Sequence, residues 1–144
     1  MCELPHRLKY RVIRTPLAVC RLAPDTDIST WASKAEFFCA TRTRDELSIV
    51  CSEEACVEEF RADDQSPDAS RVDRGWIALK LEGPFPFSMT GVLASFLHPL
   101  AEAQIPIFAI STFDTDYVLI KQNNRKQAVN ALAAAGHEKV DGDF

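Results

Sequence analysis

Glycine is scarce in this sequence, which has 5 glycines among 144 residues. Neither GxGxxG nor GxxxxGK followed by serine or threonine occurs, so the loops that hold nucleotide phosphates are missing. The GxSxG turn of serine hydrolases and the HExxH helix of zinc peptidases are also absent, since His137–Glu138 lacks the second histidine. We therefore predict no cofactor and no catalytic residues.

Cysteine follows none of the spacings that indicate zinc or redox motifs. No CxxC pair occurs, and the five cysteines are Cys2, Cys20, Cys39, Cys51 and Cys56. We predict reduced thiols that pack as small apolar side chains. Cys51 and Cys56 are near enough in sequence to join a metal site, but zinc needs two more ligands at short spacing and the histidines are scattered singly. The prediction is therefore no metal site.

Basic runs and long apolar runs are missing too. With 16 Lys and Arg against 21 Asp and Glu, the net charge is −5, whereas a nucleic-acid partner requires a basic face. No stretch approaches the roughly 18 apolar residues of a membrane span, and the charged N-terminal stretch MCELPHRLKYRV is unlike a secretory signal. We predict a cytoplasmic protein without nucleic-acid or membrane partners. An apolar content of 47% is enough for a folded core.

The stretch from residue 76 to 121 has the clearest pattern. Alternating apolar residues predict strands there, and apolar residues three and four apart predict a helix. In order, the predicted elements are a strand at 76–82, a helix at 88–104, and two strands at 105–111 and 117–121 joined by a hairpin turn. Pro99 inside the helix predicts either a kink or an end near Leu97.

A second helix and a last strand complete this half of the chain. The helix is predicted to follow Asn123 or Asn124 as its N-cap and to end at Gly136, where a left-handed residue is expected. Residues 137–144 are predicted as the strand. The order of elements is therefore β-α-β-β-α-β.

The first half shows a reduced version of the same order. Strands are predicted at 10–14, 17–22, 36–43 and 46–51, and Ser52 is the predicted N-cap of a short helix through Phe60. The polar, charged residues after it predict an exposed connection. The predicted domains are an abbreviated N-terminal unit at 10–60, the connection at 61–74, and a C-terminal unit at 75–144.

Two polar places in the second half suggest a binding site. At the first, Gly91 lets a ligand approach the start of a helix, whose N–H groups attract a carboxylate. At the second, the hairpin turn carries Asp114 and Asp116, which suit an ammonium group. A free amino acid has both groups. The alternative stays open that Ser88 or Thr90 only caps the helix and the aspartates only form the turn.

At these residues the chain resembles the ACT-domain family, in particular the small tandem-ACT proteins related to CASTOR-type amino-acid sensors. The similarity covers most of residues 17–137, in the segments LAVCRL, TRTRDELSIVC, the run from GWIALK to DYVLIK, and ALAAAGH. ELSIV and STFDTDYVL are its most specific parts. The resemblance implies an α+β fold of two ferredoxin-like (βαββαβ) ACT units in tandem, the first abbreviated. It also implies a homodimer that holds an amino acid between C-terminal units.

The resemblance also implies which residues bind that ligand. They lie in the loop entering the first helix of the C-terminal unit and at the end of the next strand: Met89, Thr90, Gly91, Val92, Leu93, Ile110, Ser111, Thr112, Phe113 and Asp116, with Asp114 beside them. The Gly91 backbone would take the ligand carboxylate, Asp116 the ammonium or a basic side chain, and Phe113 would wall the pocket. Residues 27–33 contain no glycine entry of this kind, which counts against a second site.

These inferences favour a non-catalytic regulatory protein that binds a free amino acid and passes the signal to a separate partner protein. A structural protein–protein adaptor with an empty pocket is the alternative. A small enzyme using Asp114 and Asp116 is a third hypothesis, without a nucleophile or base in the sequence to support it. Which amino acid binds stays open, because the two carboxylates suit a basic amino acid as well as any α-ammonium group.

Overall fold

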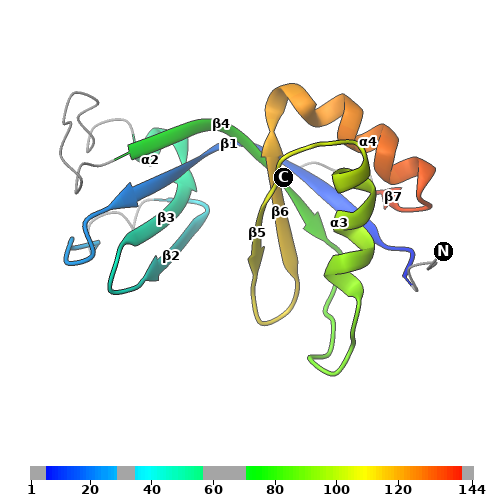
Figure 1. Ribbon diagram of the computed structural model, residues 1–144, viewed down its shortest axis with the longest axis horizontal. Coiled ribbons are helices and arrows are strands. Elements are labelled where there is room, and N and C mark those ends of the chain that lie inside the picture. Colours follow the sequence, from blue (N-terminus) through cyan, green and yellow to red (C-terminus); the bar gives the residue numbers. More distant parts are fainter. Residues whose placement is uncertain (1–5, 29–34, 57–70, 141–144) are drawn as a thin grey trace. The chain divides into compact units, whose positions relative to one another are not determined.

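The computed structural model describes residues 6–28, 35–56 and 71–140. The chain divides into two compact units, a larger one of residues 1–14 with 77–144 and a smaller one of residues 15–76. Two long strands, β1 (Lys9–Leu22) and β4 (Arg71–Leu81), contribute residues to both units (Figure 1).

The larger unit contains a sheet into which the N-terminal strand is inserted. Strands β5 (Phe108–Ser111) and β6 (Asp116–Lys121) form the predicted antiparallel hairpin, β6 borders β4, and β4 borders β1. The short strand β7 (Glu138–Lys139) pairs in parallel with the start of β1. Without β1 the order is β7-β4-β6-β5, that of a ferredoxin-like βαββαβ unit.

Because β1 is inserted into this sheet, the boundaries of the two units differ from the predicted domain boundaries. Residues 10–14 lie in the larger unit, whereas the sequence assigned them to an N-terminal unit. Backbone bonds hold the start of β1 on both sides, since Glu82 donates to Lys9 and Glu138 donates to Leu8, each at 2.8 Å. An alternating pattern indicates which face of a strand is buried, but it does not identify the neighbouring strand.

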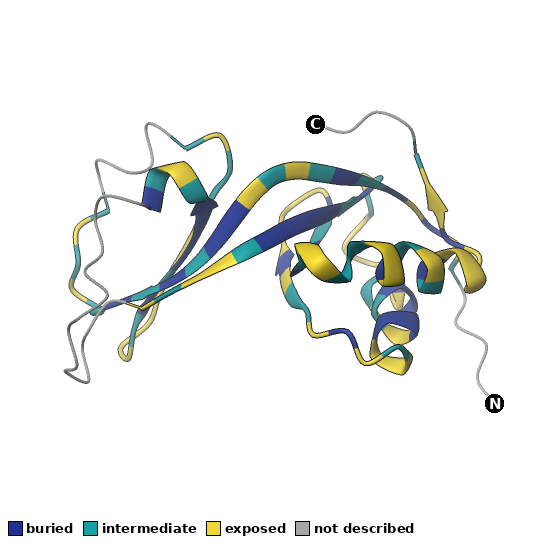
Figure 2. Ribbon diagram, turned by 90° about the horizontal axis from the view of Figure 1, so that it is seen from above, coloured by how far each residue is buried: buried dark blue, intermediate teal, exposed yellow. Residues whose placement is uncertain are grey.

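Helices α3 (Val92–Glu102) and α4 (Arg125–Ala134) cover one face of this sheet, and the 3₁₀ turn η1 (Gln122–Asn124) leads into α4. Both helices carry buried residues on one side and exposed residues on the other (Figure 2). The core combines both helices with β1, β4 and β6 through Tyr10, Val12, Ile77, Leu79, Leu81, Val92, Phe96, Leu100, Val118, Ile120, Ala128 and Leu132. Ile77, Leu79 and Leu81 thus face this core, as their alternation predicted, although Ala78 between them is buried as well.

Pro99 lies inside α3 and is buried, so the predicted end of the helix near Leu97 is wrong. A proline has no N–H to donate to the carbonyl four residues earlier, which here belongs to Ser95. His137 supplies the missing donor, since its Nε2 lies 2.9 Å from the Ser95 carbonyl oxygen. A side chain from beyond α4 thus replaces the backbone bond lost at the proline, and α3 continues to Glu102.

Gly136 ends α4 as predicted. Its φ is +92°, and its N–H and that of His137 both donate to carbonyls in the last turn of α4 at 3.0 Å, the bond pattern of a Schellman end. Asn124 is the N-cap residue, as predicted, but its side chain makes no hydrogen bond to the helix. Of the predicted last strand, Glu138–Lys139 form β7 and residues 141–144 lie outside the described residues.

The smaller unit contains the second half of β1, the first half of β4, strands β2 (Phe38–Arg42) and β3 (Leu47–Ser52), and the short helix α2 (Glu53–Cys56). Strand β3 pairs in antiparallel fashion with β2 and with β1. The strand order is β2-β3-β1-β4. The strands predicted at 36–43 and 46–51 are therefore confirmed as β2 and β3.

Several predictions for the first half differ from the structure. Pro16 does not separate two strands, because β1 runs through it. Ser52 does not cap α2, since its buried hydroxyl has no hydrogen-bond partner among the described residues. Arg71–Arg74, predicted as the end of an exposed connection, begin β4. The helix predicted to continue to Phe60 and the connection at 61–70 lie outside the described residues.

The helices of the described segments are short. None of them is both long and apolar enough to cross a membrane.

Candidate functional site

The loop before α3 presents a helix start without a side-chain cap. Gly91 is the N-cap residue and has a φ of +78°, in the left-handed region that favours glycine. A cap by Ser88 or Thr90 is therefore wrong for this helix. The first N–H groups of α3 have no side-chain acceptor from the cap, and they carry the partial positive charge of a helix N-terminus.

Hydrogen bonds hold this loop from two sides. Nε2 of His6, in the segment before β1, donates to the Thr90 carbonyl at 2.7 Å. The Ser95 hydroxyl and the Ser95 N–H both donate to the Gly91 carbonyl, at 2.7 and 2.9 Å. The helix start is thus set in position by contacts within the protein.

The turn between β5 and β6 is closed by two threonines. The Thr112 N–H donates to the Thr115 carbonyl at 2.8 Å, and the Thr112 hydroxyl donates to the same oxygen at 3.0 Å. Thr115 is buried, and its hydroxyl donates to the Leu81 carbonyl at the end of β4 at 2.7 Å. The turn is therefore attached to the strand that leads into the loop before α3.

The two aspartates of the turn have different bonds. The Asp116 Oδ1 accepts a hydrogen bond from the Ser111 hydroxyl at 2.6 Å, across the end of the hairpin. Asp114 uses its backbone carbonyl, which accepts from the Phe85 N–H at 2.9 Å. The Asp116 carboxylate is therefore the one held in a defined orientation.

These loops line a cavity of about 330 Å³ that is open to solvent. It is lined by Phe85, Pro86, Phe87, Met89, Gly91, Val92, Leu93, Ala94, Ser111, Thr112, Phe113, Asp114, Thr115 and Asp116. The structure therefore brings together the two parts of the predicted site, the helix start at Gly91 and the turn at Asp116.

Two of the predicted site residues do not line the cavity. Ile110 is buried in β5, and the exposed Thr90 uses its carbonyl to bind His6. Sequence reasoning missed the lining residues Phe85, Pro86, Phe87, Ala94 and Thr115. Phe85, Pro86 and Phe87 could have been found from the sequence, because they lie in the same loop between strand and helix as Gly91.

Aromatic side chains form part of the cavity wall on its solvent side. The rings of Phe87 and Phe113 meet edge to face with centroids 4.8 Å apart. Both are exposed, to 76% and 78%, and Met89 beside them is exposed to 43%. Exposed apolar groups that cluster in this way are typical of a surface that another molecule covers.

The chemistry of the lining suits binding rather than catalysis. Its polar side chains are serine, threonine and aspartate, and no lining residue is His, Lys, Arg or Cys. The cavity combines uncapped N–H groups at one helix start with carboxylates at one turn, which match the two charged groups of an amino acid.

The contact between the loop and the turn depends on Gly83. A Cβ built at Gly83 would lie 2.8 Å from the Asp114 carbonyl oxygen and 3.2 Å from the Thr115 Cβ. We expect Gly83→Ala to lower the free energy of unfolding by about 1–3 kcal/mol, because the turn has to move away. Urea denaturation of the purified variant measures this change.

The control for Gly83→Ala is Ser88→Ala, an exposed position in the same loop. We expect this control to change stability by less than about 0.5 kcal/mol. Equal stability of the two variants would show that the loop and the turn are not in close contact.

Family profiles match both halves of the chain. Residues 71–134 match the profile described as "ACT domain", and residues 16–59 match one described as an N-terminal domain.

Two curated relatives share moderate sequence identity with the chain. The human protein CASTOR3P is 28% identical over 109 residues, which are 71% of this chain and 64% of the relative. The cytosolic arginine sensor for mTORC1 subunit 1 from Bos taurus is 24% identical over 106 residues, 70% of this chain and 31% of the relative. The chain thus spans less than two thirds of the length of either.

Two solved structures resemble the chain along nearly its whole length. Protein Atu0741 from Agrobacterium tumefaciens is 34% identical with a TM-score of 0.80, and the match covers 97% of this chain and 98% of that one. The regulatory subunit of aspartate kinase from Thermus flavus has a TM-score of 0.66 at 11% identity, over 88% and 95% of the two chains. The second likeness is one of fold alone.

Proposed function

This chain belongs to the ACT-domain family and is related to the CASTOR proteins, and we propose that it is a regulatory protein that binds a free amino acid. The observation that carries the proposal is the single cavity lined by both the Gly91 helix start and the Asp116 turn. A relative is named as an arginine sensor and a protein of similar fold as a regulatory subunit. Both names agree with this role and with a protein that has no catalytic centre of its own.

In the proposed complex, the helix start of α3 binds the α-carboxylate of the ligand. The N–H groups that follow Gly91 have the direction and partial charge for this. The Asp116 carboxylate, oriented by Ser111, binds the α-ammonium group. Phe85 and Phe113 line the same cavity and contact the side chain of the ligand.

Arginine is the first ligand to test. The bovine relative is named as an arginine sensor. The cavity also has a second carboxylate, on Asp114, in addition to the one proposed for the ammonium group. A guanidinium group binds carboxylates in a bidentate manner, so Asp114 is the proposed partner of a basic ligand side chain.

We further propose that two copies of the chain form a homodimer that encloses the ligand. The exposed pair of Phe87 and Phe113 lies at the cavity and is suited to contact with a second copy. A separate protein would then detect the ligand-bound state, since regulation requires that the ligand binds one state better than another. A cytoplasmic location is part of this proposal and agrees with the name of the bovine relative.

The smaller unit is proposed to be a shortened copy of the larger one. Its strand order, β2-β3-β1-β4, is the order of a ferredoxin-like unit when the strands are taken in sequence from β1 to β4. The helix described there, α2, has four residues. It follows β3 and therefore corresponds to α4 of the larger unit, whereas the segment that corresponds to α3, between β1 and β2, lies partly outside the described residues.

A thermal-shift screen against the 20 amino acids tests the proposed function. A ligand present at 100 times its dissociation constant stabilises the folded state by about 2.7 kcal/mol. We expect arginine or another single amino acid to raise the melting temperature of the full chain, and glycerol or sodium chloride to leave it unchanged.

Light scattering on the same samples separates the proposal from its alternative, a protein–protein adaptor with an empty pocket. We expect a dimer whose population or stability increases with the amino acid that stabilises the fold. A dimer that responds to none of the 20 amino acids would support the adaptor and contradict the sensor.

A further inference from the structure

Three cysteines of the smaller unit meet on one face of its sheet. In the antiparallel pair of β1 and β3, Cys20 lies opposite Ile49 and Cys51 lies opposite Ala18. Residues 18 and 20 are two apart, so Cys20 and Cys51 project from the same face as diagonal neighbours. Helix α2, which follows β3, places Cys56 over this face.

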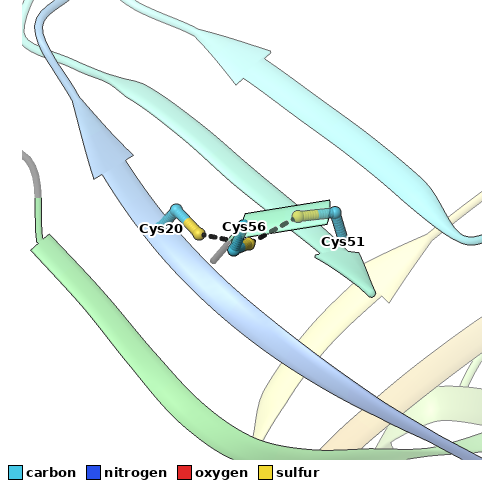
Figure 3. A group of neighbouring side chains, drawn as sticks. All are labelled: Cys20, Cys51 and Cys56. Carbon is cyan, nitrogen blue, oxygen red and sulfur yellow. Dashed lines mark hydrogen bonds between the residues drawn. The ribbon is translucent and has the colours of Figure 1, made fainter. Parts of the chain in front are cut away.

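The three sulfur atoms are closer than packing alone requires. The Sγ atoms of Cys56 and Cys51 are 2.8 Å apart, and those of Cys56 and Cys20 are 3.2 Å apart (Figure 3). All three lie within 4.8 Å of one another. Packed carbon atoms are separated by about 3.5–4.0 Å and sulfur is the larger atom. The three cysteines are thus free and buried in an apolar core, as the sequence predicted, and their sulfur atoms also contact one another.

The surroundings of the cluster are apolar and closed to solvent. The three cysteines are at most 1% exposed. They share a core with Ala18, Leu22, Leu47 and Ile49, against which Ile28, Phe38 and Val72 pack. Among the described residues, no histidine, aspartate, glutamate or other cysteine joins the three thiols as a fourth possible ligand.

Contacts within the cluster shift the pKa values of the three thiols in different directions. Hydrogen bonds from Cys20 and Cys51, with a smaller contribution from the charge of Arg74, lower the pKa of Cys56 to about 4. Hydrogen bonding within the cluster raises the pKa of Cys20, and the pKa of Cys51 is raised to about 12.

We propose that Cys20, Cys51 and Cys56 form a three-thiolate binding site for a soft monovalent metal ion, copper(I). Thiolate sulfur is the ligand that copper(I) prefers in proteins. Zinc is bound in structural sites by four protein ligands, and in three-ligand sites it keeps a position for water. Among the described residues the buried site offers three sulfur atoms and no fourth ligand, which suits copper(I), because this ion forms stable three-coordinate thiolate complexes.

The binding step requires no electron transfer. One copper(I) ion forms three Cu–S bonds, the S–H bonds of Cys20, Cys51 and Cys56 break, and three protons leave to solvent. Copper stays in the +1 state, and the total charge of reactants and products is the same. The bound group has a net charge of −2, and Arg74, whose charge already acts on Cys56, lies near enough to offset part of it.

Copper(I) titration of the full chain tests the proposal. The reduced protein is titrated under nitrogen with copper(I) supplied as its bathocuproine disulfonate complex, and bound metal is counted by native mass spectrometry. We expect one copper(I) per chain. Mutation of residues that only contact metal ligands typically lowers metal affinity by about 10–100-fold. Because Cys56→Ser removes a ligand itself, we expect a larger loss of copper(I) affinity.

Cys39→Ser is the matched control for the titration. Cys39, in β2, pairs with Val50 of β3, which is the neighbour of Cys51. Successive residues of a strand point to opposite faces, so Cys39 projects from the face opposite to that of Cys51. We expect this variant to bind copper(I) like the natural chain. If Cys56→Ser does not fold, Cys20→Ala replaces it, and copper(I) should raise the melting temperature of the natural chain but not of this variant.

Four results would each overturn the proposal. These are no transfer of copper(I) from the chelator, undiminished binding by a folded Cys56→Ser or Cys20→Ala chain, tighter binding of zinc(II) under the same conditions, and a disulfide among the three cysteines in protein isolated without reductant. The last result would mean that the short sulfur distances belong to a redox pair.

Discussion

Replacing His137 with alanine is expected to lower the free energy of unfolding by about 2–5 kcal/mol, because it leaves two buried backbone groups without partners. His137 is 5% exposed. Its Nδ1 accepts from the Leu8 N–H at 3.0 Å, and its Nε2–H donates to the Ser95 carbonyl at 2.9 Å. Urea denaturation of the variant and the natural chain measures the difference.

A variant at Pro99 tests the hydrogen bond to the Ser95 carbonyl by itself. In the His137→Ala background, Pro99→Ala restores an N–H that can reach the Ser95 carbonyl along the helix. We therefore expect Pro99→Ala to stabilise this background more than it stabilises the natural chain, by about 1 kcal/mol in a double-mutant cycle. Equal effects in both backgrounds would show that His137 does not compensate for the proline.

His98→Ala is the control for this prediction. His98 is also in α3, but its side chain is 56% exposed and its ion pair with Glu102 is on the surface. Such pairs contribute little in solvent. We expect a change below about 0.5 kcal/mol, and a loss equal to that of His137→Ala would contradict the assignment of His137 as the structural histidine.

Replacing Asp116 with asparagine is expected to weaken amino-acid binding by about 10–100-fold, which corresponds to the loss of a hydrogen bond to a charged group. Asparagine has the same shape and still accepts a bond from Ser111, so the change removes the charge with little effect on the turn. Isothermal titration with the amino acid that gives the largest thermal shift measures the affinity, and the melting temperature without ligand verifies the fold.

The matched control is Asp45→Asn, in the turn between β2 and β3 of the smaller unit. Asp45 is exposed and also occupies a hairpin turn, so it controls for the loss of one negative charge from the chain. We expect its affinity for the amino acid to equal that of the natural chain. Unchanged affinity in Asp116→Asn would refute the proposed role of this carboxylate even if an amino acid does bind.

Local patterns predicted the elements of the second half well. The alternation around Ile77 and Leu79, the helical spacing of Val92, Phe96 and Leu100, and the break at Gly136 each reflect a requirement that neighbouring residues satisfy among themselves. The two halves of the cavity were also predicted, because each lies within a short segment. Whether Ser88 or Thr90 caps α3 stayed open in the sequence, since a nearby serine or threonine indicates a cap without showing whether its side chain reaches the helix; the N-cap residue is Gly91.

Long-range pairing was not predictable in the same way. The placement of residues 10–14 beside β4 and β7, and the bond from His137 to Ser95, join residues that are far apart in the chain. The periodicity of apolar residues does not indicate which distant residue is the partner. The cysteine cluster is a similar case, since Cys20 is 31 residues before Cys51 and comes near it only through the register of β1 and β3.

By itself, the sequence determined the α+β class, the βαββαβ order of the second half, the resemblance to the ACT-domain family, and the two segments that form the cavity. Only the tertiary structure decided that β1 contributes to both units, that a histidine replaces the backbone donor lost at Pro99, and that three thiols meet in one core. The physical reason is the distance along the chain over which each interaction acts. Hydrogen-bond geometry and side-chain periodicity act over a few residues, whereas strand pairing and core contacts depend on the path of the whole chain.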